Sequence, residues 1–296
     1  MTADEKTRLA AFNWLTEQTT IHGDVLPRTL LAKGFTFEGM QIPLMSPQGI
    51  FKPKFLDLPL TITTAPKGPY NDNFGKDGFL LYRYRGTNPD HPDNVGLRKL
   101  FKQNIPLIYF LGILPGKYLA VWPVYIIGDD PKNLVFRVAV DDQSSLFKIP
   151  LLAADVAGKR EYLTAEVKVR LHQRSFREKV LAAYHSQCAL CRLRHSELLD
   201  AAHIIPDTEP DSTATVDNGI ALCKLHHAAF DSFFLGISPD YIVEVRQDIL
   251  DEDDGPMLLH GLKGLHKNKI ILPHSSSFWP KKEYLDRRFQ KFRKAV

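Results

Sequence analysis

The chain has 296 residues, of which 44% are hydrophobic and 24% charged, and its formal net charge is +4. This length exceeds the roughly 100–200 residues of a typical domain, so we expect two globular domains. The sequence pI of about 8.8 is mildly basic, which permits a nucleic-acid partner without requiring one.

The sequence offers nothing that predicts membrane attachment or secretion. It contains no apolar run of the roughly 18 residues that a membrane-spanning helix needs, and its first residues, MTADEKTRLAAF, lack the apolar core of a signal peptide. Its three cysteines cannot form a paired disulfide framework. We therefore expect a cytoplasmic protein that does not associate with membranes.

Two short helices are predicted at the start of the chain. Residues 4–20 carry Leu9, Phe12 and Leu15 at near-helical spacing, with acidic residues in the first turn. Asp24 could cap a second helix that ends at Gly34. We expect residues 1–33 to form an N-terminal helical segment.

A mostly β domain is predicted over residues 34–148. Short apolar runs alternate there with clusters of Gly, Pro and Asp, a pattern typical of a strongly twisted sheet or small barrel, and one helical segment at 94–103 interrupts them. The runs are LTIT (60–63), FLLYRY (79–84), PLIYFLGI (106–113), YLAVWPVYII (118–127) and LVFRVAV (134–140).

The second domain is predicted over residues 161–296, after a Leu/Ala/Gly linker at 149–160. Residues 161–184 have helical character and lead directly to Cys188. The tail from Pro280 predicts a basic helix at the end of the chain. We expect an α+β protein.

All three cysteines lie in the second domain, within two metal half-sites. Cys188 and Cys191 form a C-x-x-C pair, and Cys223 with His226 forms a C-x-x-H pair. Two pairs supply the four ligands of a closed tetrahedral zinc site, and the bound ion would keep the thiolates deprotonated and help the segment to fold. Because all four positions are filled, the zinc would be structural. Buried free cysteines are the alternative.

Three polar residues accompany the half-sites: His203 in LLDAAHIIP, Asn218 in an Asp-Asn-Gly turn, and His227 directly after the second pair. Together with the half-sites, the AAHI and LCKLHHAAFD stretches make residues 188–231 resemble the HNH (ββα-metal) nuclease motif in its zinc-stapled form. The resemblance is to McrA-like modification-dependent restriction enzymes, and it implies a zinc-stapled ββα-metal domain.

The resemblance implies a role for each of these residues. His203 would be the general base that takes a proton from the attacking water. The carbonyl of Asn218 would hold that base in its working orientation. His227 would begin the helix and bind the catalytic Mg²⁺ or Mn²⁺. The alternatives are a core histidine for His203 and a plain turn residue for Asn218.

Two aspartates are candidate further ligands of the catalytic ion. Asp231 lies four residues after His227 on the same helical face. Many family members carry Asp or His directly before the general base, but Ala202 occupies that position here. Asp231 or Asp200 could replace that ligand, or the ion could hold more waters. Asp200 is the weaker candidate, because in a regular strand it would face away from His203.

Basic residues precede the motif in the segment RLHQRSFREKVLAAY. Arg170, Arg174, Arg177 and Lys179 could contact DNA phosphates. A solvated basic helix face is the alternative.

Residues 34–141 resemble a second family, the SRA domain, a PUA-like β-barrel that flips modified cytosine out of duplex DNA. The matching stretches are GIFKP (49–53), GPYNDNFGKDGFLLYRYRG (68–86), DNVGLR (93–98) and PLIYF…GKYLAVWPVYII (106–127).

A flipped base needs an aromatic face to stack on and polar groups at its edge. Tyr70 could stack and Asp72 could accept from the exocyclic amine, with Tyr82, Tyr84 and Arg85 on the following strand. Arg85 stands where the family commonly has a small residue. The alternative is a turn followed by aromatic residues of the barrel core.

Together these features predict a modification-dependent restriction endonuclease that flips 5-methyl- or 5-hydroxymethylcytosine out of double-stranded DNA. Cutting both strands would require a homodimer or two binding events. Two alternatives remain: an HNH nuclease that reads unmodified sequence, phosphorothioate or DNA structure, and a zinc module that binds DNA without cutting it.

Overall fold

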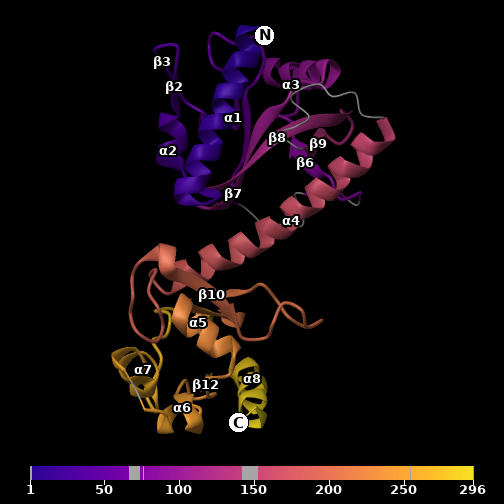
Figure 1. The fold of residues 1–296 in the computed structure, drawn as a ribbon. Helices are drawn as coiled ribbons and strands as arrows, with labels where there is room; N and C mark the ends of the chain where they lie inside the picture. Colours follow the sequence, from indigo (N-terminus) through magenta and orange to yellow (C-terminus); the bar gives the residue numbers. More distant parts are fainter. Residues whose placement is uncertain (1, 67–73, 76, 142–152, 254, 296) are drawn as a thin grey trace. The chain divides into compact units, whose positions relative to one another are not determined.

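The structure is a computed structural model that describes residues 2–66, 74–75, 77–141, 153–253 and 255–295. The chain divides into two compact units, Met1–Arg174 and Ser175–Val296 (Figure 1). None of the helices in these ranges combines the length and the apolar composition needed to cross a bilayer.

The N-terminal unit begins with the two expected helices. Helix α1 (Ala3–His22) is stabilised by a capping box in which Thr2 and Glu5 satisfy each other's backbone N–H groups. Strand β1 (Val25–Pro27) separates it from α2 (Arg28–Lys33). The capping prediction was wrong, because Asp24 precedes β1 and Pro27 occupies the N-cap position of α2.

A seven-stranded sheet forms the centre of this unit. Its strand order is β4-β5-β7-β8-β9-β6, with β1 paired to β8, and the β5–β7 pair is parallel. The remaining elements of the unit are β2 (Phe35–Phe37), β3 (Met40–Ile42), β4 (Ile50–Phe51), β5 (Thr61–Thr64), β6 (Leu80–Arg83), α3 (Pro92–Gln103), β7 (Leu107–Leu114), β8 (Lys117–Asp130) and β9 (Val135–Val140).

Both faces of the sheet are covered, which explains the unbroken apolar run of β7. Leu107 and Tyr109 pack into the cluster that includes α3, whereas Ile108 and Phe110 pack into the cluster that includes α1. Alternate residues of a strand point to opposite faces, so a strand buried on both sides must be apolar throughout.

The α+β class is confirmed, but the closed PUA-like barrel is not. Among the described residues, β4 pairs with β5 alone and β6 pairs with β9, so the sheet stays open between these two edge strands.

Helix α4 (Ala153–Ala183) differs from the predicted linker and helix. It begins inside the stretch 149–160, and the division between the two units falls within it, after Arg174. The Ala- and Leu-rich composition that suggested a linker also has high helix propensity, and here the helix extends through it.

The C-terminal unit contains a hairpin followed by a helix. Strands β10 (Leu199–His203) and β11 (Gly219–Cys223) pair antiparallel, and α5 (Lys224–Asp231) follows β11 directly. The other elements are 3-10 turns at Ser196–Leu198, Val216–Asn218, Lys263–Leu265 and Ser276–Phe278, with β12 (Leu235–Ile237), β13 (Val243–Val245), α6 (Gln247–Asp251), α7 (Pro256–Gly261) and α8 (Lys282–Lys294).

Gly219 is required by close packing and not by turn geometry. Asp217 and Asn218 lie in the 3-10 turn Val216–Asn218, and Gly219 begins β11 with φ −130°. A Cβ at Gly219 would lie 2.4 Å from Val180 and 2.8 Å from Phe176, both on α4. The missing side chain therefore lets α4 lie against the hairpin beside His203, which pairs with Gly219.

Candidate metal centre and active site

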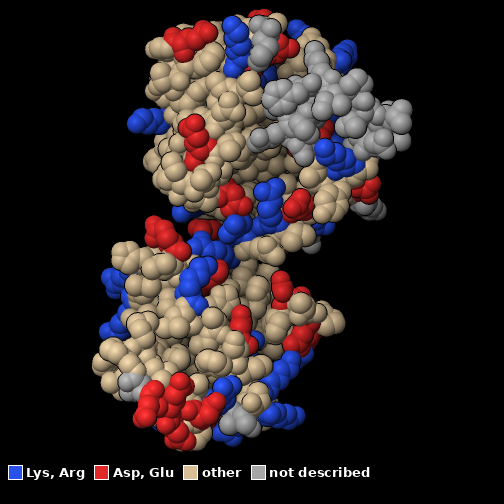
Figure 2. All heavy atoms as spheres, in the orientation of Figure 1, with Lys and Arg blue, Asp and Glu red and all other residues tan. Residues whose placement is uncertain are grey.

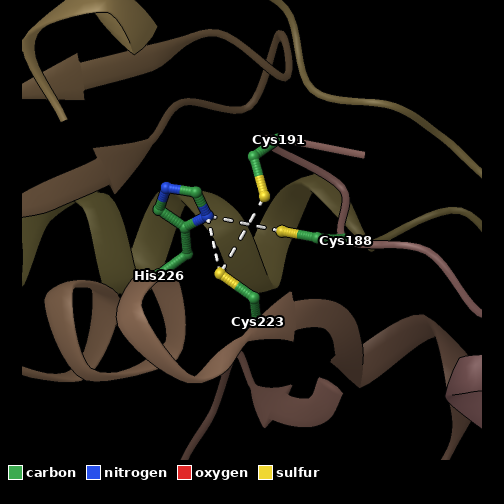
Figure 3. Close-up of side chains that lie close together, drawn as sticks. All are labelled: Cys188, Cys191, Cys223 and His226. Carbon is green, nitrogen blue, oxygen red and sulfur yellow. Dashed lines mark hydrogen bonds between the residues drawn. The ribbon is translucent and has the colours of Figure 1, made fainter. Parts of the chain in front are cut away.

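Three sulfurs and one imidazole nitrogen converge in the C-terminal unit (Figure 3). Nδ1 of His226 lies 3.4 Å from the Sγ of Cys188 and 3.2 Å from that of Cys223, and the Sγ atoms of Cys191 and Cys223 are 3.9 Å apart. Bond lengths to tetrahedral zinc predict about 3.6 Å for such N–S pairs and about 3.8 Å for S–S pairs. The donor set and its spacing fit a zinc ion.

The backbone and a carbonyl hold these donors in place. Cys188 N–H donates to Leu193, and Ala189 N–H donates to Ala221 of β11, which fixes the C-x-x-C loop to the hairpin. Nε2 of His226 lies 2.7 Å from the carbonyl oxygen of Gly261 at the end of α7. Donation to that carbonyl leaves Nδ1 free for the ion, as is usual for a histidine ligand of a metal.

The charge state of the sulfurs also fits a cation. Hydrogen bonding from Cys223 lowers the pKa of the Cys188 thiol to about 3. Hydrogen bonding to Cys188, together with burial, raises the pKa of Cys223. The thiols thus share protons, since sulfurs this close cannot all ionise unless a positive ion lies among them.

His203 ends β10 with its ring against an aromatic side chain. The ring stacks on Phe176 of α4 with 3.8 Å between centroids and an interplanar angle of 11°. Burial lowers the pKa of His203, while the charges of Asp207 and Asp231 oppose this shift and that of His227 adds to it. The imidazole is therefore neutral at neutral pH, as a general base must be.

Asn218 holds the backbone that follows His203. Its buried carbonyl accepts from the N–H of Ile205 at 2.8 Å, and its Nδ2 donates to the carbonyls of Ile205 and Thr213 at 3.1 and 2.9 Å. The asparagine thus fixes both ends of the loop between β10 and β11. This contact differs from the predicted direct orientation of the base, because it acts on the chain two residues beyond it.

His227 lies in the first turn of α5, between the two candidate aspartates. Its Nε2 is 3.2 Å from Oδ2 of Asp231, and its Nδ1 is 3.8 Å from Oδ2 of Asp200. Burial alone would raise the pKa of either carboxyl, but hydrogen bonds and nearby positive charges outweigh it and lower both. Both carboxyls are therefore ionised at neutral pH.

The two aspartates differ in what else they contact. Oδ2 of Asp200 accepts a hydrogen bond from Lys224 at 2.8 Å, so that oxygen already has a cationic partner. The side chain of Asp231 is 54% exposed, and its Oδ2 faces His227. A nitrogen and a carboxylate oxygen 3.2 Å apart could share one divalent ion whose other positions hold water and phosphate oxygens. Among the described residues, the Cys188 group is the only cluster of three or more such donors.

The basic residues predicted to contact DNA have different partners. Arg170 is exposed. Arg174 pairs with Asp24 at 2.8 Å, and Arg177 donates to the carbonyls of Ser196 and Leu199 at 2.8 and 3.0 Å, which supports the start of β10. On the face shown in Figure 2, Lys and Arg side chains gather over α4 and α8, and Asp and Glu gather over α6. Contact with DNA stays a prediction.

A cavity of about 380 Å³ lies in the N-terminal unit, where the open edges of the sheet approach each other. Strands β4, β5, β6 and β9 and residues next to them line it: Gln48, Gly49, Ile50, Thr63, Thr64, Ala65, Leu81, Tyr82, Arg83, Tyr84, Arg85 and Val135.

The predicted base-pocket residues Tyr82, Tyr84 and Arg85 all line this cavity, but each also has partners in the N-terminal unit. The ring of Tyr84 stacks on Phe136 with 4.5 Å between centroids, and Tyr82 packs edge-on against another core tyrosine, so both rings belong to the core. Arg85 pairs with Asp93. Tyr70 and Asp72 lie outside the described residues.

Two contributors to the site carry no signal in the sequence motif. Phe176 precedes the motif by a dozen positions on α4, and Arg288 of α8 contacts Asp231 at 3.0 Å. A histidine ring stacks well on an aromatic side chain, but Phe176 can be recognised as that partner only once its position in the fold is known. Arg288 is one of many basic residues in its helix and could not be selected from sequence.

Comparison with known proteins identifies the C-terminal segment. Residues 188–238 match the sequence model of the HNH endonuclease family. No curated protein matches the chain. Among solved structures, the modification-dependent TagI restriction endonuclease shares 15% identity, with a TM-score of 0.30, over 79% of this chain and 82% of that one. The type IV phosphorothioation-dependent restriction endonuclease ScoMcrA shares 15%, with a TM-score of 0.22, over 60% and 48%.

Proposed function

We propose that this chain, whose residues 188–238 match the HNH endonuclease family, hydrolyses double-stranded DNA at a site formed by His203, His227 and Asp231. The observation that carries the proposal is the position of His203, which ends β10 stacked on Phe176, beside helix α5, where Nε2 of His227 lies 3.2 Å from Oδ2 of Asp231. A general base beside a cation site is the arrangement that phosphodiester hydrolysis needs.

Each residue has a distinct part in the proposed reaction. Neutral His203 takes the proton of a water molecule that attacks the phosphorus, and stacking on Phe176 holds the ring plane during the transfer. His227 and Asp231 would hold a Mg²⁺ or Mn²⁺ ion. Asp200 lies near the other ring nitrogen of His227, Nδ1. When bound, the ion supplies positive charge to the phosphate and the leaving oxygen. Asn218 keeps the loop that follows His203 in place.

Substitution of the base tests the nuclease proposal. His203→Ala should lower the single-turnover cleavage rate by about 10²–10⁴-fold, the usual contribution of general base catalysis, while DNA affinity stays the same. The measurement is plasmid nicking in Mg²⁺ or Mn²⁺, with a filter-binding assay on the same DNA. If neither protein cuts any DNA but both bind it, the zinc module is a binding module.

We also propose that the cavity of the N-terminal unit receives a flipped 5-methyl- or 5-hydroxymethylcytosine. Its volume of about 380 Å³ falls in the range of small-ligand sites, roughly 300–1,000 Å³. Gln48, Thr63 and Thr64 bring polar groups to its wall, and Arg83 brings a positive charge that suits the flanking phosphates. The SRA-like sequence stretches support the same proposal.

A matched pair of arginine substitutions tests the cavity. Arg83 lines it, whereas Arg28 on α2 is also exposed and does not. Arg83→Ala should weaken binding to a duplex that carries one modified cytosine, and Arg28→Ala should leave that affinity within twofold. Equal affinity of the unaltered protein for modified and unmodified duplexes would remove the modified base from the proposal and leave the nuclease.

Cleavage of both strands requires a homodimer or two binding events, and of these we propose a homodimer on DNA. Light scattering of the protein with a cleavable duplex should give two chains per duplex. A single chain on a duplex that it cuts in both strands would contradict the dimer.

A further inference from the structure

Arg288 lies on α8, at a position fixed by tight packing and far along the chain from residues 188–238. Gly236 of β12 allows this packing, because a Cβ there would lie 2.6 Å from Phe292 and 3.1 Å from Phe289. The helix thus sits directly on β12, and Arg288 is buried between α8 and the hairpin–helix unit, with 7% of its surface exposed.

The guanidinium group of Arg288 bridges the two halves of the proposed active site. Its Nη1 donates to the carbonyl of Ile204, the residue after His203, at 3.3 Å. Its Nη2 donates to the carbonyl of Phe230 and to Oδ1 of Asp231, each at 3.0 Å. The group also lies 3.9 Å from the centroid of the Phe230 ring.

These contacts determine how Asp231 faces His227. The Asp231 side chain is 54% exposed, and Arg288 and His227 each contact one of its two oxygens. Arg288 holds Oδ1, and the other oxygen, Oδ2, then lies 3.2 Å from Nε2 of His227. A charge-assisted bond to a fixed guanidinium is strong enough to favour one carboxylate orientation, and it leaves the second oxygen available to an ion.

We propose that Arg288 is a positioning residue of the nuclease reaction, which presents Asp231 to the catalytic divalent ion and links the backbone after His203 to α5. This inference rests on the proposed function of the site. It makes α8 part of the catalytic unit, although that helix lies outside the segment that matches the HNH family.

If Arg288 had only a structural role, its substitution should leave the Mn²⁺ affinity of the folded protein unchanged. Removing one partner of an ion pair is costly when it leaves a buried charge unpaired, but Asp231 is 54% exposed, so water can solvate its carboxylate after the substitution. Arg288→Met keeps the packing against Phe230 and removes the bonds to Asp231. A matched control is Arg293→Met on the same helix, whose guanidinium packs on Phe289 but is 59% exposed and faces no active-site residue.

The test measures Mn²⁺ affinity by electron paramagnetic resonance of the zinc-loaded full chain, which reports on the site without requiring cleavage. Arg288→Met should weaken Mn²⁺ binding by about 10–100-fold, the usual effect of losing a group that orients a metal ligand. Arg288→Lys should restore part of the affinity, and Arg293→Met should match the unaltered protein. Saturating Mn²⁺ should recover much of the cleavage rate of Arg288→Met.

A double substitution distinguishes the loss of positioning from a folding defect. If Arg288 acts through Asp231, then Asp231→Asn and the double variant with Arg288→Met should bind Mn²⁺ equally. Additive losses, or a Mn²⁺ affinity of Arg288→Met equal to that of the unaltered protein, would overturn the positioning role. If the unaltered protein binds Mn²⁺ at this site but cuts no DNA tested, the nuclease proposal fails and the positioning result still stands on the affinities.

Discussion

At the scale of single residues, the surroundings of His203 give the site its chemistry. The ring packs on Phe176, and burial lowers its pKa below the usual value, which keeps the imidazole neutral. The burial is incomplete, so His203 stays partly accessible to solvent. With its pKa lowered, the imidazole is in the neutral, proton-accepting form at neutral pH, although it is a weaker base than a free histidine.

The lowered pKa of His203 predicts the acid limb of the pH–rate profile. Because the charged form is disfavoured in the folded protein, the protonation that abolishes catalysis should have its midpoint below about pH 6.5, the value for an unperturbed histidine. For the same reason, this group lowers the stability of the folded protein as the pH drops from about 6.5 to the folded pKa, because the unfolded state takes up the proton first. The measurement is kcat/KM between pH 5 and 8. A limb centred above pH 6.5 would show that another group is the base.

A second residue-scale prediction concerns Gly219. A methyl group there would overlap Val180 and Phe176, so Gly219→Ala should destabilise the C-terminal unit by about 1–3 kcal/mol. It should also tilt the Phe176 ring and slow cleavage. Gly255→Ala is the control, because its Cβ would have no heavy atom within 4 Å, and it should stay within about 0.5 kcal/mol. Urea unfolding measures both, and equal stabilities would contradict the packing argument.

Some features of single residues could be predicted from the sequence, and others could not. The four zinc donors could be predicted from their spacing, since ligand pairs on one chain must be close in sequence. The conformation of Asp217–Gly219 could not, because glycine serves both turns and close packing. The exposure of Tyr82 and Tyr84 depends on which strand face meets the core, and the structure places their rings inside it.

At the scale of elements, the loop before β10, the hairpin β10–β11 and helix α5 bring the four Cys and His donors and the proposed catalytic residues together on a short stretch of chain. The zinc donors link the C-x-x-C loop to the start of α5, and Gly261 ties α7 to the same centre. A hairpin and one helix bury little surface by themselves, so the zinc should contribute much of the stability of this unit.

Adjacent histidines on α5 separate the two metal roles. His226→Ala should lose the zinc and unfold the C-terminal unit, because structural zinc sites contribute on the order of 10 kcal/mol or more to folding. His227→Ala should keep the zinc and the fold but lose Mn²⁺ binding and cleavage. The measurements are zinc content by atomic spectroscopy and hydrogen exchange of residues 188–238. Loss of zinc from both variants would contradict the assignment.

At residues 149–160 the sequence predicted a linker, whereas the structure has the start of helix α4. Small and apolar residues are common in linkers and in helices alike, and sequence alone could not distinguish them. The structure extends α4 from Ala153 through Ala183, so the element that carries Phe176 and Arg177 to the active site begins in the N-terminal unit.

At the scale of the whole molecule, the sequence predicted two domains of different texture, and the chain divides into two compact units. The alternating apolar runs located most strands of the N-terminal sheet. They could not determine whether the sheet closes, because closure depends on the pairing of β4 and β6, which are distant in sequence. The described sheet is open, with the cavity between its edges.

The division into units predicts separable activities. Substitutions in the cavity, such as Arg83→Ala, should change which DNA is bound without lowering the cleavage rate at saturating DNA. His203→Ala should do the reverse. Single-turnover rates measured over a range of DNA concentrations separate the two effects. A cavity substitution that lowers the rate at saturation would show that the units do not act independently.

The most direct test compares one plasmid in three forms, unmodified, 5-methylcytosine-containing and 5-hydroxymethylcytosine-containing, with Mg²⁺ or Mn²⁺ and with His203→Ala as control. We predict that the unaltered protein cuts a modified form and spares the unmodified one, and that His203→Ala cuts none. Equal cutting of all three forms would contradict modification dependence. Cutting by His203→Ala at the rate of the unaltered protein would contradict the active site itself.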